Sequence, residues 1–222
     1  IPRTNSVDSD LVSEHPDWFY WIKDTEYEFY QAPIISEIKG SKQPSKRNLK
    51  YIYNSEMTKR HLDMFVENPV NHPEWNKYKH DLELVRKHLG VRVAPAFSDH
   101  VNDPQPPWTD VTFFRLYMDH PNESKKHLNR DYPPYILFDT IKGNLFQGEI
   151  INEPLWEMLS EIIPFYQSFG VDGARIDMGH ALPQQLTEMI ISKARERDNN
   201  FVFIAEEMNP NNAQEAKDAG YD

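Results

Sequence analysis

The stretch from 170 to 180, GVDGARIDMGH, constrains the fold of this chain more than any other part of its sequence. It follows a segment with helical periodicity and has the composition of a short strand. Side chains alternate between the two faces of a strand, so Arg175 and Asp177 share one face. Ala174 and Ile176 share the other face. We therefore expect a strand that packs its apolar face on helices and presents a charged pair on its opposite face.

A second apolar strand, FVFIA at 201–205, follows this one and ends in Glu206 and Glu207. The segment 183–197 between the two strands has the pattern of a helix. Each strand of this strand–helix–strand unit therefore has carboxylates at its C-terminal end. A (β/α) barrel carries its chemistry at that edge.

The helix before the first strand has clear boundaries in the sequence. Asn152 is a suitable N-cap, Pro154 suits the first turn, and Gly170 ends the helix. Its apolar stripe is wide enough to be buried on a sheet and comprises Leu155, Trp156, Leu159, Ile162, Ile163, Tyr166 and Phe169. Another helix is expected from 211 to 217. The last third of the chain, 151–222, is therefore predicted to be αβαβα with parallel strands.

The motif DGARID at 172–177 resembles the fourth-strand signature of the α-amylase family of glycoside hydrolases and transglycosylases. The segment IAE at 204–206 resembles the fifth-strand signature of the same family. The resemblance implies that Asp177 is the nucleophile, that Glu206 is the general acid/base, and that Arg175 orients the nucleophile. It also implies an α/β fold that is part of a (β/α)8 TIM barrel.

His180, a lone histidine three residues after Asp177 and soon followed by Pro183, makes the chain more similar to maltosyltransferases than to amylases. The resemblance gives His180 contact with the substrate, an α-glucan or maltooligosaccharide. It implies hydrolysis or transfer of α-1,4-linked glucosyl or maltosyl units through a covalent glycosyl-aspartate intermediate. The sequence does not decide between hydrolysis and transfer.

The resemblance leaves two family carboxylates outside the chain, one before Ile1 and one beyond Asp222. A whole barrel usually needs about 250 residues, and this chain has 222 and no initiator methionine. We therefore expect a piece of a longer enzyme that is inactive alone. Cutting a barrel exposes strand edges, so we expect either self-association or cover from the chain's own inserted segment.

Residues 1–150 are predicted to hold the end of barrel strand three and an inserted, loop-rich α+β segment. Its expected elements are a short helix capped near Asp8–Asp10, a strand at 51–53, and one helix from 72 to 89 ended by Gly90. Strands are expected at 91–97 and within 111–117.

Aromatic residues are concentrated in this first part, above all between 15 and 22. They indicate either a local hydrophobic cluster or a platform on which sugar rings stack. The candidates for such substrate contacts are Trp18, Trp21, Trp108 and Tyr135, the last two in proline-rich segments that restrict the backbone.

The segment 98–104 allows two interpretations. It could be a loop of the inserted segment, which we favour, or a strand end that brings Asp99 and His100 into the site. Asp99, Asn102 and Asp103 also offer the hard oxygen ligands that calcium prefers. Such residues more often cap turns, so no cofactor is expected, with calcium as the alternative.

The amino-acid composition limits the classes of partner that the chain is expected to bind. Lys and Arg total 24 against 35 Asp and Glu, and the net charge of −11 without a basic run argues against nucleic acid and anionic membranes. The absence of cysteine excludes disulfides and thiolate metal sites. Neither a signal peptide nor an apolar run of about 20 residues is present. We therefore expect a cytoplasmic protein.

The environments of Asp177 and Glu206 are expected to differ. Arg175 should keep Asp177 ionised, whereas Glu206, at the end of an apolar strand and near another negative charge, should hold a proton. One alternative is structural: a buried ion pair between Arg175 and Asp177, with Glu206 and Glu207 capping a helix. Another is a non-catalytic module that binds glucan without cutting it.

Overall fold

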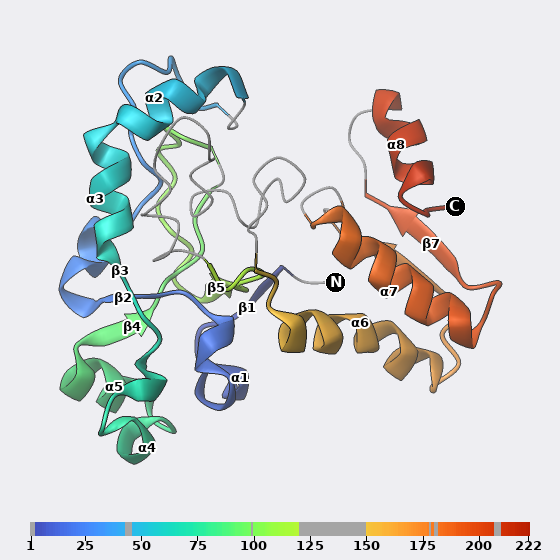
Figure 1. Cartoon of the computed structure of the whole chain (residues 1–222), viewed down its shortest axis with the longest axis horizontal. Coiled ribbons are helices and arrows are strands. Elements are labelled where there is room, and N and C mark those ends of the chain that lie inside the picture. The colour runs from blue at the N-terminus through green and yellow to red at the C-terminus, as the bar shows by residue number, and fades with distance from the viewer. Residues whose placement is uncertain are drawn as a thin grey trace.

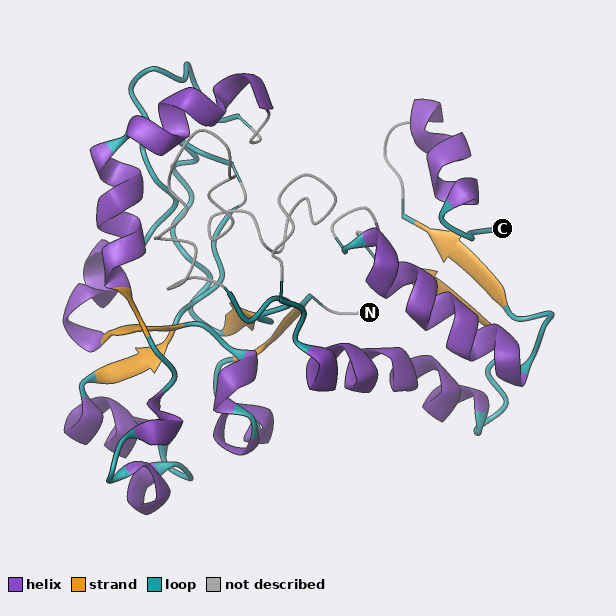
Figure 2. Ribbon diagram, in the orientation of Figure 1, coloured by secondary structure: helices purple, strands orange, loops and turns teal. Residues whose placement is uncertain are grey.

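The computed structural model describes residues 3–42, 46–98, 100–119, 150–177, 179, 182–206 and 210–222, and every structural statement below refers to these ranges. The fold is mixed α/β (Figure 1). The described strands form three small sheets with the orders β1-β5, β3-β2-β4 and β6-β7 (Figure 2). None of these sheets closes into a barrel, so the described residues show a partial α/β fold with one parallel strand pair and do not test the expected barrel.

The first part of the chain alternates short helices with antiparallel strands. Its helices are α1 (Asp10–Glu14), α2 (Leu49–Asn54), α3 (Glu56–Met64), α4 (Trp75–Tyr78) and α5 (Leu82–Leu89). Its strands are β1 (Thr4–Ser6), β2 (Trp21–Lys23), β3 (Phe65–Val66), β4 (Val91–Val93) and β5 (Val111–Phe113). β2 lies between β3 and β4, and β1 pairs with β5, all antiparallel. β4 and β5 confirm strands at the start of the predicted segments 91–97 and 111–117, and each strand ends after three residues.

Helix boundaries in this part follow capping side chains. Ser9 caps α1 by accepting from the Leu11 amide. The helix predicted from 72 to 89 is divided in two, because Asp81 accepts from the amides of Glu83 and Leu84 and begins α5. Gly90 ends α5 at φ 67°, in the left-handed conformation that suits glycine.

The prediction of a strand at 51–53 is wrong, since these residues lie in α2. Tyrosine and isoleucine favour strands only weakly, and tertiary packing decides such short segments. Here the helix buries Ile52 completely, and α3 follows after Ser55.

The last third of the chain has the predicted αβαβα order. It comprises α6 (Glu153–Gln167), β6 (Gly173–Ile176), α7 (Gln184–Arg197), β7 (Val202–Ala205) and α8 (Ala213–Asp218). β6 and β7 are parallel, with Gly173 opposite Val202 and Ile176 opposite Ala205. Gly170 adopts φ 89° between α6 and β6, as a helix-ending glycine can.

α6 and α7 pack together along the same side of this strand pair (Figure 1). They bury Ile176 and Phe203, whose side chains are on the covered face. On the opposite face Val202 and Ile204 are exposed. Because parallel sheets are usually covered on both faces, this uncovered apolar face is unusual.

The first part joins the last third through α6. Trp156 is buried and its indole nitrogen donates to the Leu116 carbonyl at 2.9 Å. Its ring meets Tyr117 edge-on in the larger of two hydrophobic cores. The smaller core lies around Tyr20, Tyr30 and Phe97.

The predicted stripe of α6 is only partly buried. Leu155, Leu159 and Ile163 reach the core, but Tyr166 and Phe169 are 52% and 72% exposed, so that part of the prediction is wrong. At this end of the helix the ring of Phe165 contacts the other two aromatic rings at the surface instead.

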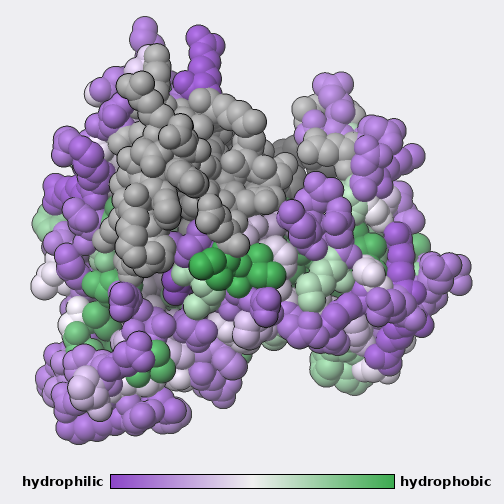
Figure 3. Space-filling view, viewed as in Figure 1, coloured by the Kyte–Doolittle hydropathy of each residue, from purple (hydrophilic) through white to green (hydrophobic). Residues whose placement is uncertain are grey.

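The surface is predominantly hydrophilic on the face seen in Figure 3, with apolar residues gathered near its centre. None of the described helices is both long enough and apolar enough to span a membrane.

Candidate active site

The two predicted carboxylates lie at neighbouring strand ends. Asp177 directly follows β6, and Glu206 directly follows β7. The Glu206 amide donates to the Ile176 carbonyl at 3.0 Å, which continues the parallel ladder by one residue. The strand register alone therefore brings these carboxylates to the same edge of the sheet, as the alternation in the sequence predicts.

Arg175 links the two carboxylates. Its Nη1 lies 3.3 Å from Oδ1 of Asp177, and its Nη2 lies 2.9 Å from Oε1 of Glu206. The side chains of Arg175 and Asp177 are 56% and 68% exposed, while that of Glu206 is 28% exposed. One guanidinium thus holds both carboxyl groups on the open face of the sheet, close to solvent.

The pKa of Asp177 is lowered. The largest cause is a hydrogen bond from the Glu206 side chain, and the charge and hydrogen bond of Arg175 act in the same direction. A hydrogen bond between two carboxyl groups requires one proton. The lowered pKa assigns the ionised form to Asp177, beside the Arg175 guanidinium.

The interpretation of Arg175 and Asp177 as a buried structural ion pair does not fit this geometry, because both side chains are more than half exposed. Glu206 follows a strand and its side chain contacts Arg175 rather than capping a helix. Glu207 lies outside the described residues.

Two of the proposed sugar contacts are corrected by the structure. Trp18 and Trp21 are 4% and 1% exposed, so neither ring has a free face for a sugar. The Trp21 indole donates to the Pro16 carbonyl at 2.7 Å, and the Trp18 ring stacks on His15. The alternative interpretation, a local hydrophobic cluster, is correct for these two residues.

Trp108 is 39% exposed and keeps a face that a ligand could reach. It is held by a backbone bridge to Ala96. His180 and Tyr135 lie outside the described residues. Of the predicted site residues, the structure therefore brings together Arg175, Asp177 and Glu206.

The alternative of a calcium site at 98–104 finds no support. The Asn102 side chain bonds to the backbone of Ile35 and Ile38, and Asp103 accepts from Ser98 and from the Gln105 amide. The Asp103 contacts shape a local turn, and the Asn102 contacts tie this segment to the loop around Ile35 and Ile38. Asp99 lies outside the described residues, and the described ones contain no cluster of three metal-ligating side chains.

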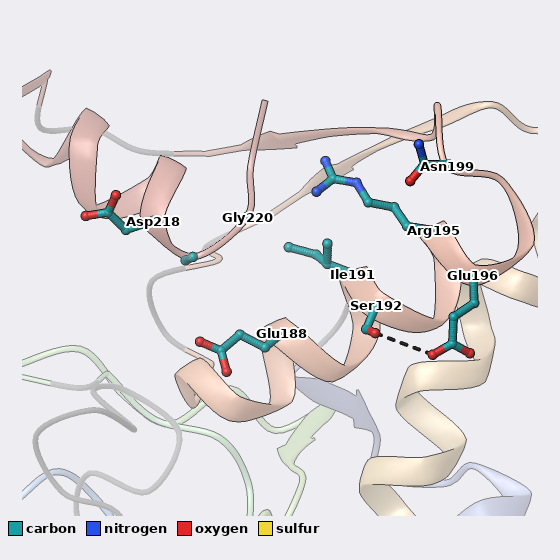
Figure 4. A pocket seen from close by; sticks show the side chains of 9 residues that line it. Glu188, Ile191, Ser192, Arg195, Glu196, Asn199, Asp218 and Gly220 are labelled. Carbon is teal, nitrogen blue, oxygen red and sulfur yellow. Dashed lines mark hydrogen bonds between the residues drawn. The ribbon is translucent and has the colours of Figure 1, made fainter.

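A hollow of about 460 Å³ lies away from these carboxylates, between α7 and the segment that follows α8 (Figure 4). It is widely open, and Arg195, which lines it, is bound by Asp222 at 2.8 Å. The other lining carboxylates, among them Glu188 and Glu196, bond to side chains of their own helix. We therefore do not assign the reaction centre to this hollow.

The sequence missed one feature of the site. Arg175 was expected to orient Asp177 alone, and it also binds Glu206. The signal was present in the alternation, which places Arg175, Asp177 and Glu206 on one face.

In comparisons with known proteins, no family model matches the chain, and no curated protein matches it significantly.

Proposed function

We propose that this chain carries the nucleophile and the acid/base of a retaining enzyme that acts on α-1,4-glucans. The observation that supports this best is the pairing of an ionised Asp177 with Glu206 across Arg175 at the C-terminal ends of two parallel strands. This arrangement brings an ionised Asp177 and a second carboxyl group to one strand edge, and retaining glycosidases use such a pair as nucleophile and acid/base.

In the first step the Asp177 carboxylate attacks the anomeric carbon of a bound α-glucan. The bond between that carbon and the glycosidic oxygen breaks, and Glu206 gives its proton to the departing oxygen. The products are a glycosyl ester on Asp177 and a glucan shortened by the transferred unit.

In the second step Glu206, now a carboxylate, removes a proton from water or from the hydroxyl of another glucan. The oxygen so activated attacks the anomeric carbon and releases Asp177. Attack by water gives hydrolysis, and attack by a glucan hydroxyl gives transfer of the glucosyl or maltosyl unit.

Binding of substrate must separate the two carboxyl groups, since retaining enzymes hold them about 5–5.5 Å apart. A hydrogen bond joins the two side chains directly, and such bonds span only about 2.5–3.0 Å between oxygens. We infer that Arg175 keeps its contact with Asp177 during this separation, so that the nucleophile stays ionised and oriented.

Two substitutions in the full-length protein test the proposal. Asp177→Asn keeps the side-chain shape and loses the nucleophilic charge, and Glu206→Gln cannot transfer a proton. Each should lower glucosyl or maltosyl transfer from maltooligosaccharides by at least a thousandfold, while glucan binding stays within a few-fold.

The matched controls are Glu196→Gln and Asp218→Asn, which alter exposed carboxylates on α7 and α8 and should leave turnover unchanged. If wild-type protein binds glucan and shows no turnover, the chain belongs to a binding module instead. If Asp177→Asn retains substantial transfer, the nucleophile is another residue.

A further inference from the structure

A second cavity, of about 150 Å³, lies against α3 in the first part of the chain. It is lined by five apolar residues and four polar ones: Phe29, Ala32, Pro33, Met57 and Met64, with Glu28, Gln31, Arg60 and His61. It is built from other elements than the Asp177–Glu206 pair. Its size suits one small ring or one branched side chain.

Two opposite charges border this cavity without neutralising each other. Arg60 lies over the Phe29 ring, 5.5 Å from its centroid. Within the described part of the chain, this ring contact is the interaction seen for Arg60, and Glu28 takes part in no ion pair or hydrogen bond. The cavity therefore has at its border a cation and an anion that are not paired with an opposite charge of the described residues.

The rest of the wall is apolar or neutral. Met57 and Met64 provide flexible, polarisable side chains that adapt to differently shaped ligands. His61 is 2% exposed, and burial lowers its pKa to about 3. The Gln31 backbone opposes this shift, but neither ring nitrogen has a partner in ordinary hydrogen-bonding geometry. At neutral pH His61 therefore adds no second positive charge.

We propose that this cavity binds a free α-amino acid with an apolar side chain. Arg60 takes the carboxylate, Glu28 takes the ammonium group, and Met57, Met64 and Phe29 surround the side chain. A simple anion is disfavoured by Glu28, and a simple cation by Arg60. A neutral ligand leaves both charges without an ionic partner.

The binding test uses the 222-residue chain and four probes, and follows binding by NMR chemical-shift changes and calorimetry. The probes are leucine, methionine, N-acetyl-leucine amide and glucose. Leucine and methionine should bind with saturation in the millimolar range or below. The capped leucine, which lacks both charges, should bind at least tenfold more weakly, and glucose should not bind.

Variants at the cavity test the assigned contacts. Arg60→Met and Glu28→Gln should each weaken leucine binding at least tenfold. The matched controls Lys59→Met and Glu26→Gln change neighbouring charges that do not line the cavity and should leave binding unchanged. All four positions are at the surface or partly so, and circular dichroism should confirm an unchanged fold.

The proposal is overturned if leucine fails to bind at tens of millimolar, if glucose or capped leucine binds as tightly, or if Arg60→Met binds leucine like wild type. None of these outcomes depends on glucan turnover, and the measurements can be repeated in Asp177→Asn with the same expected result.

Discussion

Protonation of His61 should destabilise the fold as the pH falls. In the folded protein its ring is buried between Tyr30, Phe65 and Phe97, at 5.2–5.4 Å between ring centroids. Burial lowers its pKa to about 3, whereas a histidine in an unfolded chain has a pKa of about 6.5. The unfolded state therefore takes up the proton first.

This difference in pKa sets the direction in which the stability of the fold changes with pH. The stability contributed by neutral His61 is fully present above pH 6.5 and is lost progressively as the pH falls towards 3. The free energy of unfolding should fall by about 1.4 kcal/mol per pH unit within this window, or about 3 kcal/mol between pH 6.5 and 4. Against a typical total of about 5–15 kcal/mol, this loss is large.

The assay is urea unfolding followed by tryptophan fluorescence at pH 7, 6, 5 and 4. His61→Phe removes the titrating group and keeps an aromatic ring in an aromatic site. The difference between wild type and this variant should change steadily with pH, in favour of the variant at low pH. Carboxylates contribute equally to both proteins and cancel in this comparison.

His80→Phe, at an exposed position, is the matched control, and its curve should stay parallel to that of wild type. Parallel curves for wild type and His61→Phe would refute the reasoning, since they would mean that His61 titrates alike in the folded and unfolded states.

Three further outcomes are expected from the fold. Gly90→Ala should lower the urea-derived free energy of unfolding by about 1–2 kcal/mol, because φ is 67° at this helix end; an unchanged midpoint would contradict the left-handed cap. Asp81→Ala should lower the free energy of unfolding by about 1 kcal/mol, because the α5 cap is lost. Asp63→Ala, at a similarly exposed position that does not cap a helix, should lower it by less. We expect the chain to self-associate through the open face of β6 and β7, so Ile204→Lys should reduce the concentration dependence of light scattering; equal scattering by both proteins would exclude that face.

The last third of the chain was predictable because its signals are local. Asn152 and Gly170 set the limits of α6, and the alternation around Arg175 sets the face that each side chain occupies. Glu206 follows from the same rule in the next strand. Where a strand register fixes a pair of side chains, the sequence predicts the geometry of the site.

Other features depended on tertiary packing that the sequence does not encode locally. An aromatic segment such as the one that holds Trp18 and Trp21 can form either a ligand platform or a buried cluster. Only the burial of these two side chains distinguishes between the alternatives. Tyr166 and Phe169 continue the periodicity of α6, but periodicity does not reveal where the partner surface ends. That Arg60 forms no ion pair has no signal in the sequence, because side-chain packing decides whether an acid such as Glu28 or Glu56 reaches it.

The break between α4 and α5 did have a signal in the sequence, but the helical periodicity outweighed that signal in the prediction. The apolar spacing from Trp75 to Leu89 continues across the break, and this periodicity predicts one helix. Asp81 in front of Leu82 is a good N-cap, and its side chain forms both capping hydrogen bonds. A capping residue inside a periodic segment should therefore be weighed against the periodicity.

The proposed chemistry is tested most directly by trapping the covalent intermediate on Asp177. A fluorinated glucosyl donor with a good leaving group slows the second step, so the glycosyl ester accumulates and can be located by mass spectrometry of peptides. We predict one added glycosyl mass on the peptide that contains Asp177, and none in Asp177→Asn. A label on a different carboxylate, or steady turnover of the donor without any labelled peptide, would contradict the assignment of Asp177 as the nucleophile.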